Sequence, residues 1–66
     1  MNILTSSQKL ILLRDLGLTG SEIARATGIT QPTISRIERG VHANPKETAV
    51  LAIDALYRKI IQSQDS

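Results

Sequence analysis

Residues 20–40 read GSEIARATGITQPTISRIERG and contain the signals of two short helices joined by a tight turn. Thr19 and Glu22 have the spacing of a capping box, in which the threonine hydroxyl accepts from the Glu22 amide and the Glu22 carboxylate reaches back to the cap. We therefore expect a helix from about residue 20 to residue 27. Gly28 follows at the position where a left-handed residue ends a helix, so it is predicted to begin the turn.

The second helix of this stretch is predicted from about residue 31 to residue 39. Thr30 is a suitable N-terminal cap for it. Pro32 fits only in a first turn, because deeper in a helix it would lack a hydrogen-bond donor and clash with the preceding turn. Gly40 is expected to end this helix.

Six positions meet the steric needs of a compact helix corner. Ala24 is small enough for the second helix to cross close to it, and Gly28 accepts a positive φ. The apolar positions that fill the corner and dock it on the rest of the domain are Ile23, Ile29, Ile34 and Ile37. This pattern resembles the helix-turn-helix of phage Cro and lambda-repressor-type regulators, over roughly residues 10 to 56 and most closely over residues 20 to 40.

The resemblance implies an all-α fold, namely a compact four-helix domain with a long C-terminal helix. Residues 1–66 would then form a single helix-turn-helix DNA-binding domain, with the N-terminal end of the second motif helix in the major groove. One alternative is a helical hairpin that binds no nucleic acid, because helix–glycine–helix patterns also occur by chance. Some Cro proteins replace the C-terminal helices with strands, but the helical spacing up to Ile61 favours helices here.

The resemblance also implies which side chains of the second motif helix read bases. They are Gln31, Pro32 and Arg36, with Ser35 adjacent. A glutamine can pair in bidentate fashion with adenine and an arginine with guanine, and each such pair gives about 1–3 kcal/mol of discrimination. Pro32 could offer DNA only an apolar contact, for example to a thymine methyl group. A purely structural role, as a residue that starts the helix, explains Pro32 about as well.

Several other polar residues are candidates for contacts with DNA phosphates. These are Ser21, Thr30, Thr33, Arg39, Asn44 and Lys46. In the family, the first residue of the first motif helix is often a glutamine that clamps a phosphate. Here that residue is Gly20, so a clamp would need a backbone amide or Ser21. His42 is interpreted as a solvated loop residue, with a backbone contact to DNA as the alternative.

A helix is also predicted from about residue 6 to residue 16, because Thr5 and Gln8 form a second capping-box pattern and Gly17 follows. We expect a core stripe at helical spacing, formed by Leu10, Leu13 and Leu16. Two neighbouring residues, Ile11 and Leu12, would widen this stripe. Leu18 would plug the junction with the next helix.

An ion pair often ties the first helix of such regulators to the end of the recognition helix. We align the family's basic residue with Leu13, which has no charge, so that correspondence fails. Glu38 could instead pair with Arg14 or with Arg25.

A long C-terminal helix is predicted from residue 45 to about residue 62. Asn44 is a suitable cap, Pro45 suits the first helical position, and Glu47 completes a capping pattern. One face contains Ala49, Ile53, Leu56 and Ile60, and a neighbouring face contains Val50, Tyr57 and Ile61. The first face would cover the other helices, and the second would contact another copy of the chain. A single wide core face is the alternative. Residues from about 63 to 66 are expected to be a disordered tail.

Composition limits the remaining possibilities. Sixty-six residues allow one domain with marginal stability. The chain has no cysteine, and its single histidine and six acidic residues suggest neither a metal site nor a cofactor. We find no nucleophile–base grouping typical of an enzyme.

No signal peptide or membrane-spanning stretch is evident, so the cytoplasm is the expected location. The net charge is only +2, but it is unevenly placed. Residues 20–46 contain Arg25, Arg36, Arg39 and Lys46 against Glu22 and Glu38, and several of these cations fall near the expected DNA side.

These observations favour a sequence-specific DNA-binding regulator, most simply a phage or mobile-element repressor. A monomer would contact few base pairs, so we expect a homodimer on double-stranded DNA, with half-sites about one helical turn apart. The alternative is a protein-interaction module, such as an antitoxin-like protein or a co-regulator. The DNA-binding end of a recombinase or transposase is a third hypothesis, although 66 residues leave no room for a catalytic domain.

Overall fold

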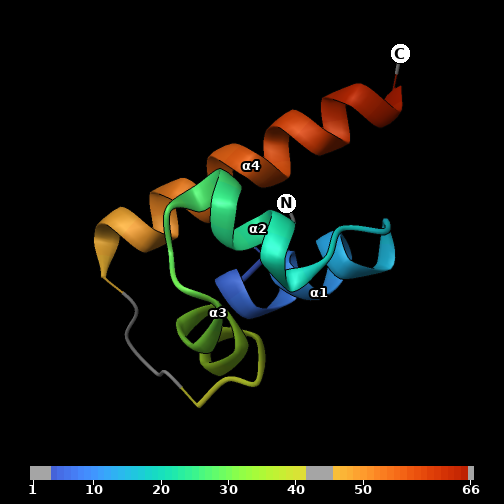
Figure 1. The fold of residues 1–66 in the computed structure, drawn as a ribbon. Helices are drawn as coiled ribbons and strands as arrows, with labels where there is room; N and C mark the ends of the chain where they lie inside the picture. Colours follow the sequence, from blue (N-terminus) through green and yellow to red (C-terminus); the bar gives the residue numbers. More distant parts are fainter. Residues whose placement is uncertain (1–3, 42–45, 66) are drawn as a thin grey trace.

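The computed structural model describes residues 4–41 and 46–65, which form four helices in chain order. They are α1 (Ser6–Asp15), α2 (Gly20–Thr27), α3 (Gln31–Glu38) and α4 (Glu47–Asp65). The long α4 runs across one side of the molecule, and α1, α2 and α3 pack below it (Figure 1). No strand occurs in the described residues, and the predicted all-α fold is confirmed.

Capping boxes begin both α1 and α2, as predicted. The Thr5 hydroxyl accepts from the Gln8 amide at 3.1 Å, and the Thr19 hydroxyl accepts from the Glu22 amide at 3.1 Å. The Glu22 carboxylate accepts from the Thr19 amide at 2.8 Å, and this hydrogen bond lowers the pKa of Glu22 below its ordinary value. The second helix has the predicted bounds, whereas α1 ends at Asp15, one residue earlier than expected.

Gly28 ends α2 in the left-handed conformation, with φ +76°. Its amide donates to the carbonyl of Ala24 at 2.8 Å, which closes the last turn of the helix. No atom lies within 4 Å of the place that a Cβ at this position would take. A substitution here therefore tests the backbone conformation alone, without a steric clash.

We expect Gly28→Ala to lower the free energy of unfolding by about 1–2 kcal/mol, because a Cβ disfavours positive φ. Chemical denaturation followed by circular dichroism measures this change. Gly28→Asn is the matched control and should cost less, because asparagine tolerates the left-handed region better. Equal stability of Gly28→Ala and the parent protein would contradict the turn conformation.

Thr30 occupies the N-cap position of α3, but its side chain does not cap the helix. Its hydroxyl donates to the Thr33 hydroxyl at 3.0 Å, so the predicted capping hydrogen bond is wrong. Pro32 lies in the first turn, as predicted. The helix ends at Glu38, one residue before the expected end, and Gly40 follows with φ +76°.

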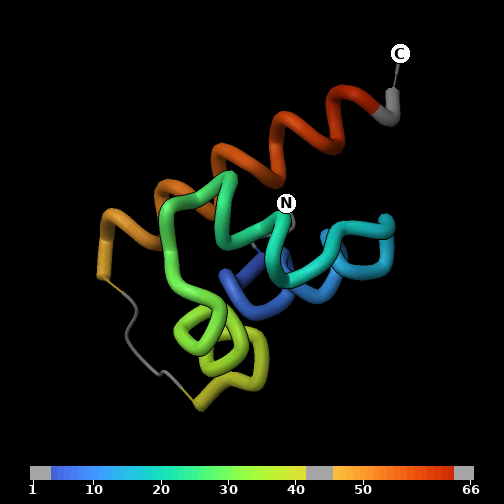
Figure 2. Tube along the Cα trace, viewed as in Figure 1, coloured from blue at the N-terminus to red at the C-terminus, as the bar shows by residue number. Residues whose placement is uncertain are grey.

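The last helix is longer at its C-terminal end than predicted. It reaches Asp65 instead of Gln62, so the backbone of residues 63–65 is helical where we expected a disordered tail. The predicted capping residues Asn44 and Pro45 lie outside the described residues. In the view of Figure 2, α4 rises away from the other three helices toward its C-terminal end.

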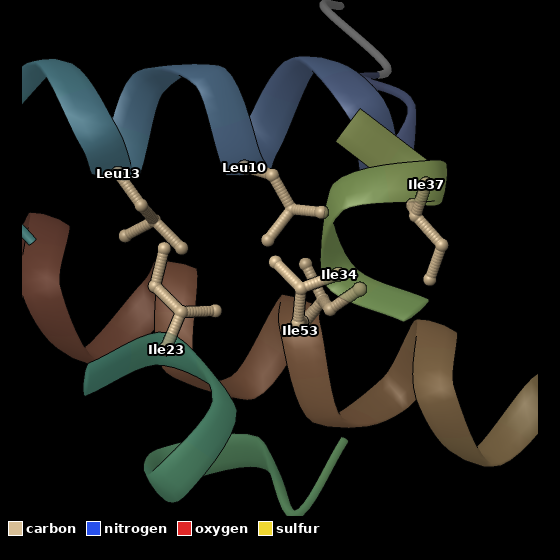
Figure 3. Close-up of a cluster of buried hydrophobic side chains, with 6 residues drawn as sticks. All are labelled: Leu10, Leu13, Ile23, Ile34, Ile37 and Ile53. Carbon is tan, nitrogen blue, oxygen red and sulfur yellow. The ribbon is translucent and has the colours of Figure 1, made fainter. Parts of the chain in front are cut away.

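All four helices contribute to the hydrophobic core, which lies between α1 and α4 (Figure 3). Its buried residues are Leu10, Leu13, Ile23, Ile34, Ile37 and Ile53. Six partly buried residues pack against them: Leu18, Ala24, Ile29, Leu56, Tyr57 and Ile60. The predicted roles of Leu18 and of the isoleucines of residues 20–40 agree with this packing.

The predicted apolar stripe of α1 is too wide. Leu16 is 41% exposed, and Ile11 and Leu12 are exposed as well, so the prediction of core positions is wrong for these three residues. The buried residues of α1 are Leu10 and Leu13, which point into the core in Figure 3. The reason is that α1 packs against α3 and α4 on one side, while its opposite side has no covering helix.

Asp54 of α4 connects this helix to α1. Its carboxylate accepts from Lys9 Nζ at 2.9 Å and lies 3.0 Å from Arg58 Nε. The hydrogen bond from Lys9 is the largest cause that lowers the pKa of Asp54 below its ordinary value. The carboxylate therefore stays charged at a lower pH in the folded chain than in the unfolded chain.

This difference makes stability depend on pH. A lowered pKa contributes stability that is present above the unfolded value of about 3.9 and is lost as the pH falls through the folded value. We expect unfolding midpoints in urea to decrease below about pH 4, and Asp54→Asn to flatten this decrease. Asp15→Asn removes an exposed carboxylate and controls for the change in net charge. Identical pH profiles for Asp54→Asn and the parent protein would contradict the role of the ion pair.

Candidate nucleic-acid interface

The two sides of α3 differ sharply. Ile34 and Ile37 are buried in the core. The predicted DNA-contacting residues on the other side are exposed, apart from half-buried Ser35, and they are Gln31, Pro32, Arg36 and Arg39. Residues 31–39 thus present one amide and two guanidinium groups to solvent, while the two isoleucines anchor α3 on the core. This arrangement suits hydrogen bonding to base edges and phosphates.

The predicted phosphate contacts do not form a single cluster. Ser21 is exposed in the first turn of α2, and Lys46 is exposed just before α4. Lys46 and Thr33 border the same cleft of about 500 Å³, which lies between the turn, α3 and the start of α4. The Thr30 hydroxyl donates its hydrogen to Thr33, so it is less free to bind a phosphate. Asn44 lies outside the described residues, as does His42.

Two contacts from α1 hold the C-terminal end of α3 in place. The Ser7 hydroxyl donates to the carbonyl oxygen of Glu38 at 2.7 Å. Arg14 Nη1 lies 3.9 Å from Glu38 Oε1, so of the two partners considered for Glu38 the structure has Arg14. Leu13, where we aligned the family's basic residue, is buried in the core. The role of Ser7 could not be predicted, because a serine contact to a carbonyl 31 residues away leaves no local pattern in the sequence.

A family model described as "Helix-turn-helix domain" matches residues 9–58, which is most of the chain. The chain belongs to the helix-turn-helix family. The predicted family is thereby confirmed, and α2 and α3 are the two helices of the motif. This helix-turn-helix domain is therefore a DNA-binding domain by family, and α3 is its second motif helix.

The helix-turn-helix domain is also similar to protein P2 of Acyrthosiphon pisum secondary endosymbiont phage 1. The two are 46% identical over 44 residues, which cover 67% of this chain and 47% of the phage protein. The match thus spans about half the length of that relative. No solved structure matches the chain.

The three residues of α4 that were predicted to contact a second copy of this helix-turn-helix domain are each partly exposed. Val50 and Ile61 are half-buried, and Tyr57 packs against the core, so Tyr57 already contributes to the fold. Leu51 of α4 is 60% exposed, and it was not among the residues predicted to contact a second copy.

Within residues 4–41 and 46–65, no group of acidic, histidine or cysteine side chains could hold a metal ion, and no helix is long and apolar enough to cross a membrane.

Proposed function

We propose that this protein is a sequence-specific transcriptional regulator of phage or mobile-element type, which acts as a repressor by covering a promoter. The observation that carries the proposal is the division of α3 into a buried isoleucine side and an exposed polar side. A helix anchored in this way can enter a major groove without losing its packing on the domain.

The base-reading residues of the proposal are Gln31 and Arg36, with Pro32 and Ser35 beside them. Gln31 is the first residue of α3, at the end that enters the groove in this motif, and its amide suits adenine. Arg36 lies further along the helix and suits the O6 and N7 atoms of guanine. Pro32 supplies an apolar contact for a thymine methyl group.

Phosphate contacts position the domain on the duplex in this proposal. Arg39 follows α3, Ser21 lies at the start of α2, and Lys46 precedes α4. Thr30, Thr33 and Asn44 are the further phosphate candidates. Such contacts fix the orientation of the domain while carrying no sequence information.

We further propose that two copies bind a pseudo-palindromic operator. A single α3 reaches only a few base pairs, and two copies on half-sites about 34–36 Å apart would read twice as many. The second copy would contact α4 through Val50, Tyr57 and Ile61. The phage relative is consistent with a phage regulator, although its name states no function.

The test is selection of bound duplexes from a random DNA pool, scored for a motif and for its symmetry. A two-fold symmetric motif with half-sites about 10 bp apart is the expected result. An asymmetric motif would retain DNA binding but remove the symmetric dimer. A folded sample that enriches no motif at low salt would contradict the proposed function.

A protein-interaction module is the second candidate. The observation that favours it is the exposed apolar surface on the side of α1 away from the core and at Leu51 of α4. In that case changes of Gln31 and Arg36 would leave activity unchanged, whereas a polar substitution of Leu51 would abolish it.

A further inference from the structure

The start of α2 lacks a side chain at its first position. Gly20 is the first residue of α2, so the helix itself supplies no side chain that could bind a ligand at that position. The space above Gly20 is occupied all the same. A Cβ built on Gly20 would lie 2.9 Å from Nη1 of Arg14, a residue in the last turn of α1. The guanidinium of Arg14 therefore covers the position that a side chain at residue 20 would fill.

The guanidinium is held loosely by the protein itself. Arg14 Nη1 lies 3.9 Å from Glu38 Oε1, which is too long for a hydrogen bond. The Arg14 side chain is 46% exposed, and its guanidinium forms no hydrogen bond within the described residues. A guanidinium has five N–H donors, so those of Arg14 are available to an external acceptor. Glu38 orients the group without saturating it.

The position of Arg14 is close to both helices of the motif. Gly20 begins α2, and Glu38 ends α3, so the guanidinium lies where the start of the first motif helix meets the end of the second. Ser21, a predicted phosphate ligand, is the next residue along α2 and is exposed. An arginine binds phosphate oxygens through two parallel N–H donors more strongly than a neutral amide does.

We propose that Arg14 of α1 is a DNA phosphate ligand, and that Gly20 is required because it leaves room for the guanidinium. This inference rests on the proposed DNA binding and adds to it a ligand from outside the two motif helices. It also assigns Gly20 a function, which is to let the clamp come from α1 instead of α2.

The first experiment measures the salt dependence of duplex binding for Arg14→Gln. Losing one phosphate contact should reduce the slope of log K against log salt by about 0.9 and weaken binding roughly tenfold at low salt. The loss should be equal for specific and random duplexes, because phosphates are the same in both. Arg14→Lys should keep most of the slope, because it keeps the positive charge.

Two controls separate phosphate binding from a structural role. Glu38→Gln removes the ion pair but leaves the guanidinium, so the slope should not fall; a purely structural pair would make Glu38→Gln and Arg14→Gln equivalent. Arg58→Gln removes an exposed, ion-paired arginine of α4 and should leave the slope unchanged. Thermal unfolding of every variant confirms that the fold persists.

Gly20→Ala tests the space above residue 20. The added Cβ meets only the flexible end of the Arg14 side chain, so the fold should remain while the guanidinium is displaced. We expect Gly20→Ala to reproduce part of the Arg14→Gln loss, and the double variant to bind no more weakly than Arg14→Gln alone.

Two results would overturn the inference, and they are distinguishable. If the parent protein binds DNA and Arg14→Gln has the same salt slope, Arg14 is not a phosphate ligand and the proposed function stands. If the parent protein binds no duplex at low salt, the proposed function fails and the inference fails with it.

Discussion

Ile53→Ala is expected to lower the free energy of unfolding by about 2–5 kcal/mol, the usual cost of truncating a fully buried isoleucine. Ile53 lies in the N-terminal half of α4, is 0% exposed and points toward the core residues of the other helices (Figure 3). A domain of this length has a total stability of about 3–10 kcal/mol. The substitution should therefore leave a large fraction of the protein unfolded at 37 °C.

Leu51→Ala is the matched control, because it removes a similar volume from the same helix at a position that is 60% exposed. It should change the free energy of unfolding by no more than about 0.5 kcal/mol. Urea denaturation followed by circular dichroism measures both variants. Equal effects of the two substitutions would show that α4 does not pack on the core through Ile53.

The double substitution of Gln31→Ala and Arg36→Ala is expected to abolish the preference for the selected operator. Each bidentate base contact contributes about 1–3 kcal/mol of discrimination, or roughly 5- to 150-fold. Both side chains are exposed on the side of α3 opposite Ile34 and Ile37, so their removal leaves the core intact. Weak binding to random duplexes should survive, because the phosphate contacts remain.

The single variants assign the bases. Gln31→Ala should relax specificity at one base pair without changing the salt slope, because glutamine is uncharged. Arg36→Ala should relax specificity at a different base pair. Competition between the operator and its single-base variants measures both effects, and Arg58→Ala serves as the control for a lost arginine. Unchanged discrimination in the double variant, with the fold intact, would exclude base readout by α3.

Much of the interface followed from residues 20–40. The isoleucine spacing placed Ile34 and Ile37 inward, and this left Gln31 and Arg36 on the exposed side. The ion pair at the end of α3 could not be assigned in the same way. The correspondence with the family fell on uncharged Leu13 and left Arg14 and Arg25 as candidate partners of Glu38. In the structure the partner is Arg14, about a third of a turn around α1 from Leu13.

The sequence alone determined where α1 and α3 begin and where α2 begins and ends. The capping boxes of α1 and α2 and the left-handed Gly28 act through hydrogen bonds within about four residues, so neighbours in the chain contain all the information. The tertiary structure alone decided that Leu16 faces solvent and that Arg14 lies over Gly20. These outcomes depend on which elements pack against α1 and which space they leave open, and such elements are distant in the chain.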